Sequence, residues 1–99
     1  MFGLDDRTVK MIRQFLQVEP EVLEARVYGS RAMGNYRPGS DIDLAIWTNS
    51  AHDISFHVKA MLEALPTPYM FDVTDYNRIS HQPLKDHIDR VGKLFYRRT

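Results

Sequence analysis

The segment 41–47 constrains the fold of this chain more than any other, because its large aliphatic residues alternate with Asp41, Asp43 and Ala45. Apolar residues recur at every second position, a period that is typical of a half-buried strand. They are Ile42, Leu44 and Ile46. The intervening positions begin with Asp41 and Asp43, whose carboxylates therefore point to the same side, roughly 6.5 Å apart along the backbone. The pattern predicts a strand with one face on a core and paired negative charges on the other.

The rest of the sequence predicts a short series of helices and strands. Helical spacing begins after Asp5, a suitable N-cap, and should stop near Gln17, because Pro20 disfavours helix at the residue before it. Further patterns indicate a strand at 25–28, the first turn of a short helix at 30–33 and a turn at 36–40. After the strand at 41–47 they indicate a second helix at 54–65, a third strand at 70–74 and a last helix at 83–91. Gly92 should cap the last helix, and the apolar end 94–96 must dock somewhere. This order predicts an α/β or α+β fold: one small mixed β-sheet flanked by helices.

Length and charge limit the possible classes of function. The 99 residues suit one domain over residues 1–99. The 13 basic side chains balance 13 acidic ones, and a zero net charge argues against direct binding of nucleic acid. The absence of cysteine excludes a disulfide framework and a thiolate zinc site. No apolar stretch approaches a membrane span and no signal-peptide pattern opens the chain, so a cytoplasmic location is expected.

Carboxylates are the candidate metal ligands. A donor set of oxygens without His or Cys suits Mg²⁺ or Mn²⁺, and Asp41 and Asp43 are placed to close on one ion or a close pair. A third carboxylate on a neighbouring strand would complete a two-ion clamp on the attacking and leaving oxygens of a transfer reaction. Asp72, in the middle of the third strand, is the predicted third ligand, and Asp75 is the alternative. For the Asp-x-Asp pair alone, the alternative is an ordinary solvated strand face.

The residues after the first strand predict a phosphate-binding turn. Gly29 lets the backbone approach a phosphate, and Ser30 offers a hydroxyl at the start of a helical turn. Arg31 and Arg37 flank the turn with guanidinium donors that fit phosphate oxygens. Ser40 is expected either to cap the next turn or to donate to a phosphate. The alternative for this group is an ordinary strand-ending turn with solvated arginines.

The four histidines are predicted to be surface residues. His52 and His57 lack the i, i+4 spacing of a helical zinc site, and neither His81 nor His87 belongs to a recognised metal-ligand motif. The sequence therefore assigns none of them to the site.

These residues together resemble the signature of the minimal nucleotidyltransferases, in the DNA polymerase β-like superfamily. The matching run is Gly29-Ser30-Arg31-Ala32-x-Gly34-x-x-Arg37-x-Gly39-Ser40-Asp41-Ile42-Asp43-Leu44. Gly92 and the apolar end 94–96 also resemble the C-terminus of the family, so the resemblance covers nearly the whole chain.

The resemblance implies a polymerase β-like fold and a reaction. That reaction transfers a nucleoside monophosphate from a triphosphate, with ATP the expected substrate, to an acceptor hydroxyl with release of pyrophosphate. Carried onto this chain, it implies that Asp41 and Asp43 ligate Mg²⁺ or Mn²⁺. Asp72 would ligate one ion and help to activate the acceptor. Gly29 and Ser30 would hold the triphosphate, with Arg31 assisting.

The resemblance also implies a partner. Larger relatives carry a second domain that helps to hold the acceptor, so this chain is expected to complete its site with a partner protein or by forming a homo-oligomer. Minimal members often pair with a HEPN-domain protein as a toxin–antitoxin module, and in some pairs the antitoxin adds AMP to a tyrosine of the HEPN toxin. Two alternatives stay open: a non-catalytic module that neutralises a HEPN partner by binding it, and an aminoglycoside-type transferase acting on a small molecule.

Overall fold

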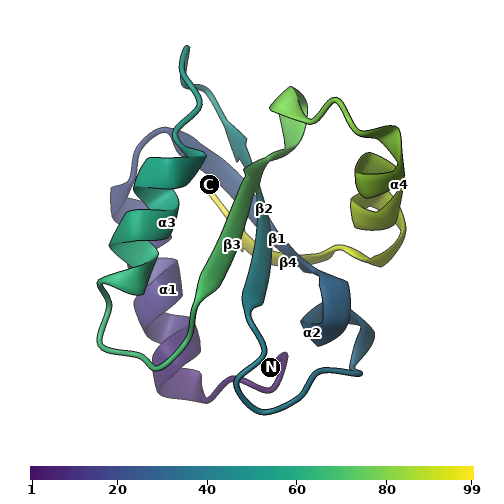
Figure 1. Cartoon of the computed structure of the whole chain (residues 1–99). Coiled ribbons are helices and arrows are strands. Elements are labelled where there is room, and N and C mark those ends of the chain that lie inside the picture. The colour runs from purple at the N-terminus through teal and green to yellow at the C-terminus, as the bar shows by residue number, and fades with distance from the viewer.

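Four strands form a mixed sheet at the centre of the protein, whose computed structural model describes all residues 1–99 (Figure 1). In spatial order they are β3 (Phe71–Asp75), β2 (Ile42–Thr48), β1 (Val22–Tyr28) and β4 (Lys93–Arg97). β1 pairs antiparallel with both β2 and β4, whereas β2 and β3 are parallel. The predicted fold, a small mixed sheet flanked by helices, is confirmed.

The helices divide between the two faces of this sheet. α1 (Asp6–Val18) and α3 (Ser55–Glu63) lie on one face, while α4 (Gln82–Val91) lies on the other, next to the short α2 (Gly29–Met33) (Figure 1). A turn of 3₁₀ helix, η1 (Tyr76–Arg78), follows β3. None of these helices has the length and apolar character needed to cross a membrane.

Two apolar cores result from this arrangement. The larger comprises 16 buried residues and includes the alternating Ile42, Leu44 and Ile46 of β2, packed with α1 and α3. The smaller lies under α4 and consists of Tyr28, Ala45 and Ile88. Because side chains alternate along a strand, the face of β2 that carries Asp43 is the face that α4 covers.

Most elements begin and end close to their predicted positions. The carboxylate of Asp5 caps α1 by accepting a hydrogen bond of 2.7 Å from the Thr8 N–H. The helix stops at Val18, two residues before Pro20, as the restriction on the residue before proline requires. α2 forms where the first turn of a short helix is predicted.

The end of the chain and the first strand differ from prediction. The apolar end 94–96 docks as β4, an edge strand beside β1, and β1 itself begins at Val22 rather than Ala25. Charged residues bound the short apolar run of β4, so its sequence carries too little alternation to mark it as a strand. Gly92 does follow α4, but its backbone is extended rather than left-handed.

Candidate active site

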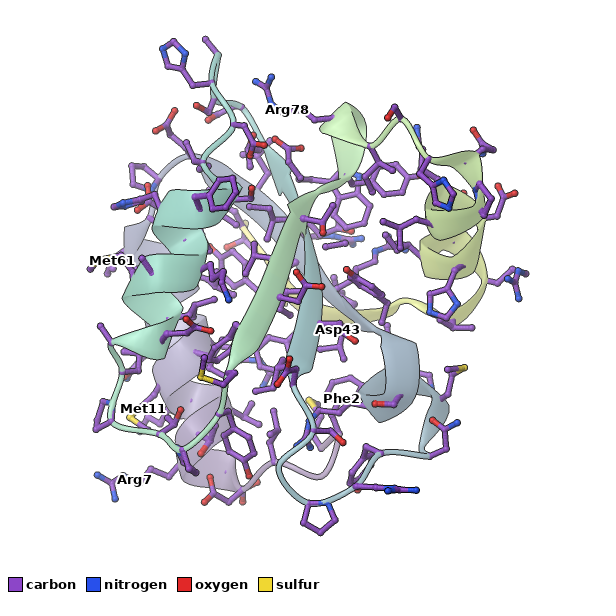
Figure 2. All side chains as sticks on the ribbon, in the orientation of Figure 1. Phe2, Arg7, Met11, Asp43, Met61 and Arg78 are labelled. Atoms are coloured by element: carbon purple, nitrogen blue, oxygen red, sulfur yellow. The ribbon has the colours of Figure 1, made fainter.

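Two of the predicted ligands lie side by side in the sheet. In the parallel register of β2 and β3, Asp43 is the direct partner of Asp72. Asp41 comes directly before β2, two residues from Asp43, so the two side chains point to the same side of the strand. Asp43 is half-buried, whereas the other two are exposed, and Figure 2 shows Asp43 on the side of β2 that faces α2. The structure therefore brings the three aspartates to one end of the α4 face.

The charges of these aspartates act on one another. Burial raises the pKa of Asp43 to about 6, and the nearby carboxylates of Asp72 and then Asp41 contribute further to this rise. His87 and Arg31 pull the pKa of Asp43 in the opposite direction. A carboxylate with this environment gains from a bound cation, because the cation offsets both desolvation and repulsion.

Hydrogen bonds from α3 to the start of β3 set the position of Asp72. The carboxylate of Glu63, at the end of α3, accepts hydrogen bonds from the Phe71 N–H at 2.9 Å and from Lys59 Nζ at 3.0 Å. Lys59 also donates to the Phe71 carbonyl at 2.7 Å. Both backbone groups of the residue before Asp72 are thus held by α3, which fixes the start of β3 beside β2.

Asp75, the alternative third ligand, lies elsewhere. It is 5% exposed and points to the same face of the sheet as Phe71 and Val73, which is opposite to the face of Asp72. Its carboxylate accepts hydrogen bonds from the Asn77 N–H at 3.2 Å, from Arg78 Nε at 3.1 Å and from Thr48 Oγ1 at 3.4 Å. These contacts make Asp75 the cap of η1, and of the two candidates only Asp72 is adjacent to Asp43.

The Gly29–Ser30 turn packs directly on this group. Tyr28, the last residue of β1, is paired with Asp43, so the turn begins beside the carboxylate. Gly29 has a φ of +69°, and a Cβ at this position would overlap the Asp43 carboxylate oxygen Oδ2. Only glycine satisfies both the backbone angle and the close approach. Ser30 then opens α2 in a half-buried position.

Arg31 is 3% exposed, and its guanidinium is already engaged. Its Nε and Nη2 donate to the Ser40 carbonyl at 3.1 and 2.9 Å, and its Nη1 donates to the Phe2 carbonyl at 2.9 Å. The guanidinium carbon also lies 5.0 Å from the ring centre of Tyr36 and 5.1 Å from that of Tyr69. Three of the five N–H groups of this guanidinium are bonded and the side chain is buried, so we assign Arg31 to holding the loop 34–40.

Ser40 and Arg37 close the turn before β2. The Ser40 hydroxyl accepts a hydrogen bond of 2.8 Å from the Arg37 N–H, and the Ser40 N–H donates to the Arg37 carbonyl at 2.9 Å. Of the two roles expected for Ser40, the structure shows the cap. The Arg37 side chain is exposed, and its contact with a phosphate stays a prediction.

The prediction that His87 is a surface residue is wrong, because its side chain is half-buried at the site. Its Nε2 accepts a hydrogen bond of 3.2 Å from the Gly29 N–H, and its ring meets the Tyr28 ring edge-on. A signal for its position exists in the helix. His87 falls three residues after Leu84 and four before Val91, so it belongs to the inward stripe of α4.

The donor chemistry fits a hard divalent ion, although the side chains do not form a complete cage. All donors are carboxylate oxygens, the type that Mg²⁺ and Mn²⁺ prefer. No group of three or more acidic, His or Cys side chains stands close enough to hold an ion by itself. Mg²⁺ is commonly held by one or two carboxylates together with substrate phosphates, and the Asp43 and Asp72 pair meets that need.

The polymerase β nucleotidyltransferase family model matches residues 10–99, which include every residue of this site. The chain belongs to this family. The match covers β1, the turn, the strands that carry the aspartates, and α4. No curated protein matches the chain.

Solved structures share this nucleotidyltransferase fold at low identity. A toxin–antitoxin structure with AMP-PNP has a TM-score of 0.71 and 20% identity, over 97% of this chain and 76% of the other. The structure of the AMPylated HEPN toxin of Shewanella oneidensis with its MNT antitoxin has a TM-score of 0.64 and 19% identity, over 99% of this chain and 74% of the other. A minimal nucleotidyltransferase has a TM-score of 0.66 and 23% identity, over 92% of this chain and 96% of the other.

Proposed function

We propose that this protein is a metal-dependent nucleotidyltransferase that moves AMP from ATP to a hydroxyl of a HEPN-domain partner protein, as the antitoxin of a toxin–antitoxin pair. The observation that carries the proposal is the pairing of Asp43 with Asp72 across parallel strands, beside a left-handed glycine packed on Asp43. Membership of a nucleotidyltransferase family supports the reaction class, and the AMP-PNP complex of a similar fold supports ATP as the substrate.

Each residue has a place in this reaction. Gly29 and Ser30 hold the triphosphate through the turn, and exposed Arg37 adds a positive charge nearby. Asp41, Asp43 and Asp72 would hold one or two Mg²⁺ or Mn²⁺ ions, which when bound supply charge stabilisation at the phosphate oxygens. The acceptor oxygen bonds to the α-phosphorus, the bond to the β-phosphate oxygen breaks, and pyrophosphate leaves. Asp72 orients the acceptor hydroxyl and takes up its proton as the new bond forms.

The open side of the site favours a macromolecular acceptor. β3 is an edge strand of the sheet and Asp72 is exposed on it, so a side chain of a partner has access to the carboxylates. Similar folds occur in structures of HEPN toxins with MNT antitoxins, and one of those toxins is AMPylated. A HEPN-domain hydroxyl is therefore the acceptor that we propose.

The direct test is transfer of label from α-phosphate-labelled ATP, with Mg²⁺, to a HEPN-domain protein that binds this chain. We expect labelling of that protein by the wild type and none by an Asp41→Asn/Asp43→Asn variant. Asp6→Asn is the matched control, because Asp6 is an exposed aspartate on α1, outside the site. Equal labelling by the wild type and the double variant would refute catalysis by this site.

A non-catalytic antitoxin is the second candidate, because a similar fold occurs as an MNT antitoxin in complex with a HEPN toxin. In that case the protein neutralises its partner by binding alone. The Asp41→Asn/Asp43→Asn variant separates the two functions, since a binding module would still protect cells from the toxin, whereas a transferase would not.

A further inference from the structure

His87 stands where α4 meets the phosphate-binding turn. It comes from the last helix of the chain, yet its Nε2 accepts the hydrogen bond of 3.2 Å from the Gly29 N–H. This bond joins segments that lie 58 residues apart in the sequence. His87 is not among the residues that carry the resemblance, so the resemblance assigns this residue no role.

The turn requires an anchor for a physical reason. Gly29 is needed because a Cβ would strike Asp43 and because its φ is +69°. The same absence of a Cβ lets the chain reach many other backbone angles, so sterics alone do not hold the peptide in place. A hydrogen bond to the Gly29 N–H supplies the missing restraint, since it fixes the plane of the peptide that enters the turn.

His87 is itself held firmly enough to serve as that anchor. Its ring packs edge-on against Tyr28, with ring centres 6.0 Å apart and planes at 80°. Tyr28 is 6% exposed, and its hydroxyl lies 3.4 Å from Thr74 Oγ1 on β3. The neighbouring Ile88 is 1% exposed in the core beneath α4, which fixes the rotation of the helix. A chain of contacts therefore runs from β3 through Tyr28 and His87 to Gly29.

We propose that His87 is a positioning residue for nucleotide binding: by accepting the Gly29 N–H it holds the Gly29–Ser30 turn in the conformation that receives the triphosphate. This inference rests on the proposed function of the turn. His87 acts through the Gly29 N–H rather than on the reacting atoms. α4 thereby becomes part of the nucleotide site as well as a cover for the sheet.

Two substitutions separate the hydrogen bond from packing. His87→Leu keeps apolar bulk against Tyr28 but has no acceptor. His87→Gln places an amide oxygen at a similar reach to Nε2 and restores the acceptor. We expect the Kd for ATP with Mg²⁺ to rise about fivefold to tenfold in His87→Leu, the loss typical of one hydrogen bond, and to return to within about twofold of wild type in His87→Gln. In transfer assays the KM for ATP should change more than kcat.

A measurement on the wild-type protein without nucleotide tests the anchor itself. In ¹⁵N-labelled protein, the N–H···N bond should give a through-hydrogen-bond coupling between the Gly29 amide nitrogen and His87 Nε2. The exchange rate of the Gly29 amide proton should rise in His87→Leu and recover in His87→Gln. These readouts need no bound nucleotide and no activity, so they judge the anchor even if the proposed transferase function fails.

The outcomes are distinct. The coupling together with recovery of ATP affinity in His87→Gln, but not in His87→Leu, supports the proposal. Absence of the coupling overturns it, as does an equal loss of affinity in the two variants or an unchanged affinity in a folded His87→Leu protein. If the wild type shows the coupling and binds no ATP, the anchor exists but does not serve nucleotide binding, and both the inference and the proposed function fall. If it binds ATP but transfers no AMP, only the proposed function fails.

Discussion

At the scale of single residues, the site depends on a contact between a backbone and a carboxylate. Gly29 and Asp43 come from different strands, and the register of β1 with β2 brings them together. The close approach leaves no room for a methyl group. The identity of residue 29 and the position of Asp43 are therefore coupled, and a change at one displaces the other.

Gly29→Ala tests this coupling. We expect a loss of about 2–3 kcal/mol in the free energy of unfolding, from the left-handed φ and from displacement of Asp43, together with loss of ATP binding. Urea unfolding and a nucleotide titration measure the two effects. Gly34→Ala is the control, because Gly34 has a φ of +84° but no atom lies within 4 Å of a Cβ there. It should cost only about 1 kcal/mol. Equal losses in the two variants would show that the contact with Asp43 does not matter.

The raised pKa of Asp43 gives a prediction for stability against pH. The pKa is about 6 in the folded protein and about 3.8, its ordinary value, when unfolded. Between these values the folded state binds more protons, so the Asp43 contribution to stability falls as pH rises through this window. Asp43→Asn removes the cost of holding an ionised carboxylate at this position. It should stabilise the metal-free protein by about 1 kcal/mol at pH 8, after discounting for solvent screening. The gain should vanish near pH 4.

Urea unfolding of both proteins at several pH values measures this difference. Because other carboxylates titrate in the same range, the wild type and the variant must be compared at each pH. A difference in stability that does not change between pH 4 and pH 8 would contradict the assignment of the raised pKa to Asp43.

At the scale of elements, local patterns predicted some parts of the site and not others. β2 and β3 were predictable because their apolar residues alternate, and this alternation placed Asp43 and Asp72 on matching faces. β4 was not, because it is short and has charged ends, and its partner β1 lies far away in the sequence. The hydrogen bonds of Arg31 could not be predicted from the sequence either, since their acceptors are backbone carbonyls that only the folded loop brings near.

Substitution of Arg31 tests the loop assignment. Arg31→Met leaves the carbonyls of Phe2 and Ser40 without their charged donor, and we expect a loss of about 2–4 kcal/mol in unfolding free energy. Arg37→Met, at an exposed position, should change stability by less than about 0.5 kcal/mol while weakening ATP binding. Urea unfolding and ATP titration measure both. A stable Arg31→Met protein that has lost only its ATP affinity would instead place Arg31 at the triphosphate.

At the scale of the whole molecule, the site lies where segments from the full length of the chain meet. The turn after β1, the starts of β2 and β3, and His87 of α4 all contribute to it. The meeting of Asp41 and Asp43 with the turn could be predicted because the family signature is local in sequence, and the position of Asp72 followed from the alternation along the third strand. His87 could not, since its partner is a backbone N–H that becomes a neighbour only when α4 packs across the sheet.

Transfer of AMP through the aspartates of this chain, as we propose, adds mass to the HEPN-domain partner. Intact-mass spectrometry of that partner, after incubation with ATP and Mg²⁺, detects the addition. We predict that the partner gains the mass of one or more AMP groups with the wild-type chain, and gains none with Asp41→Asn/Asp43→Asn or after chelation of the metal. A partner whose mass stays unchanged with the wild-type chain, under conditions in which the two proteins bind one another, would contradict the account.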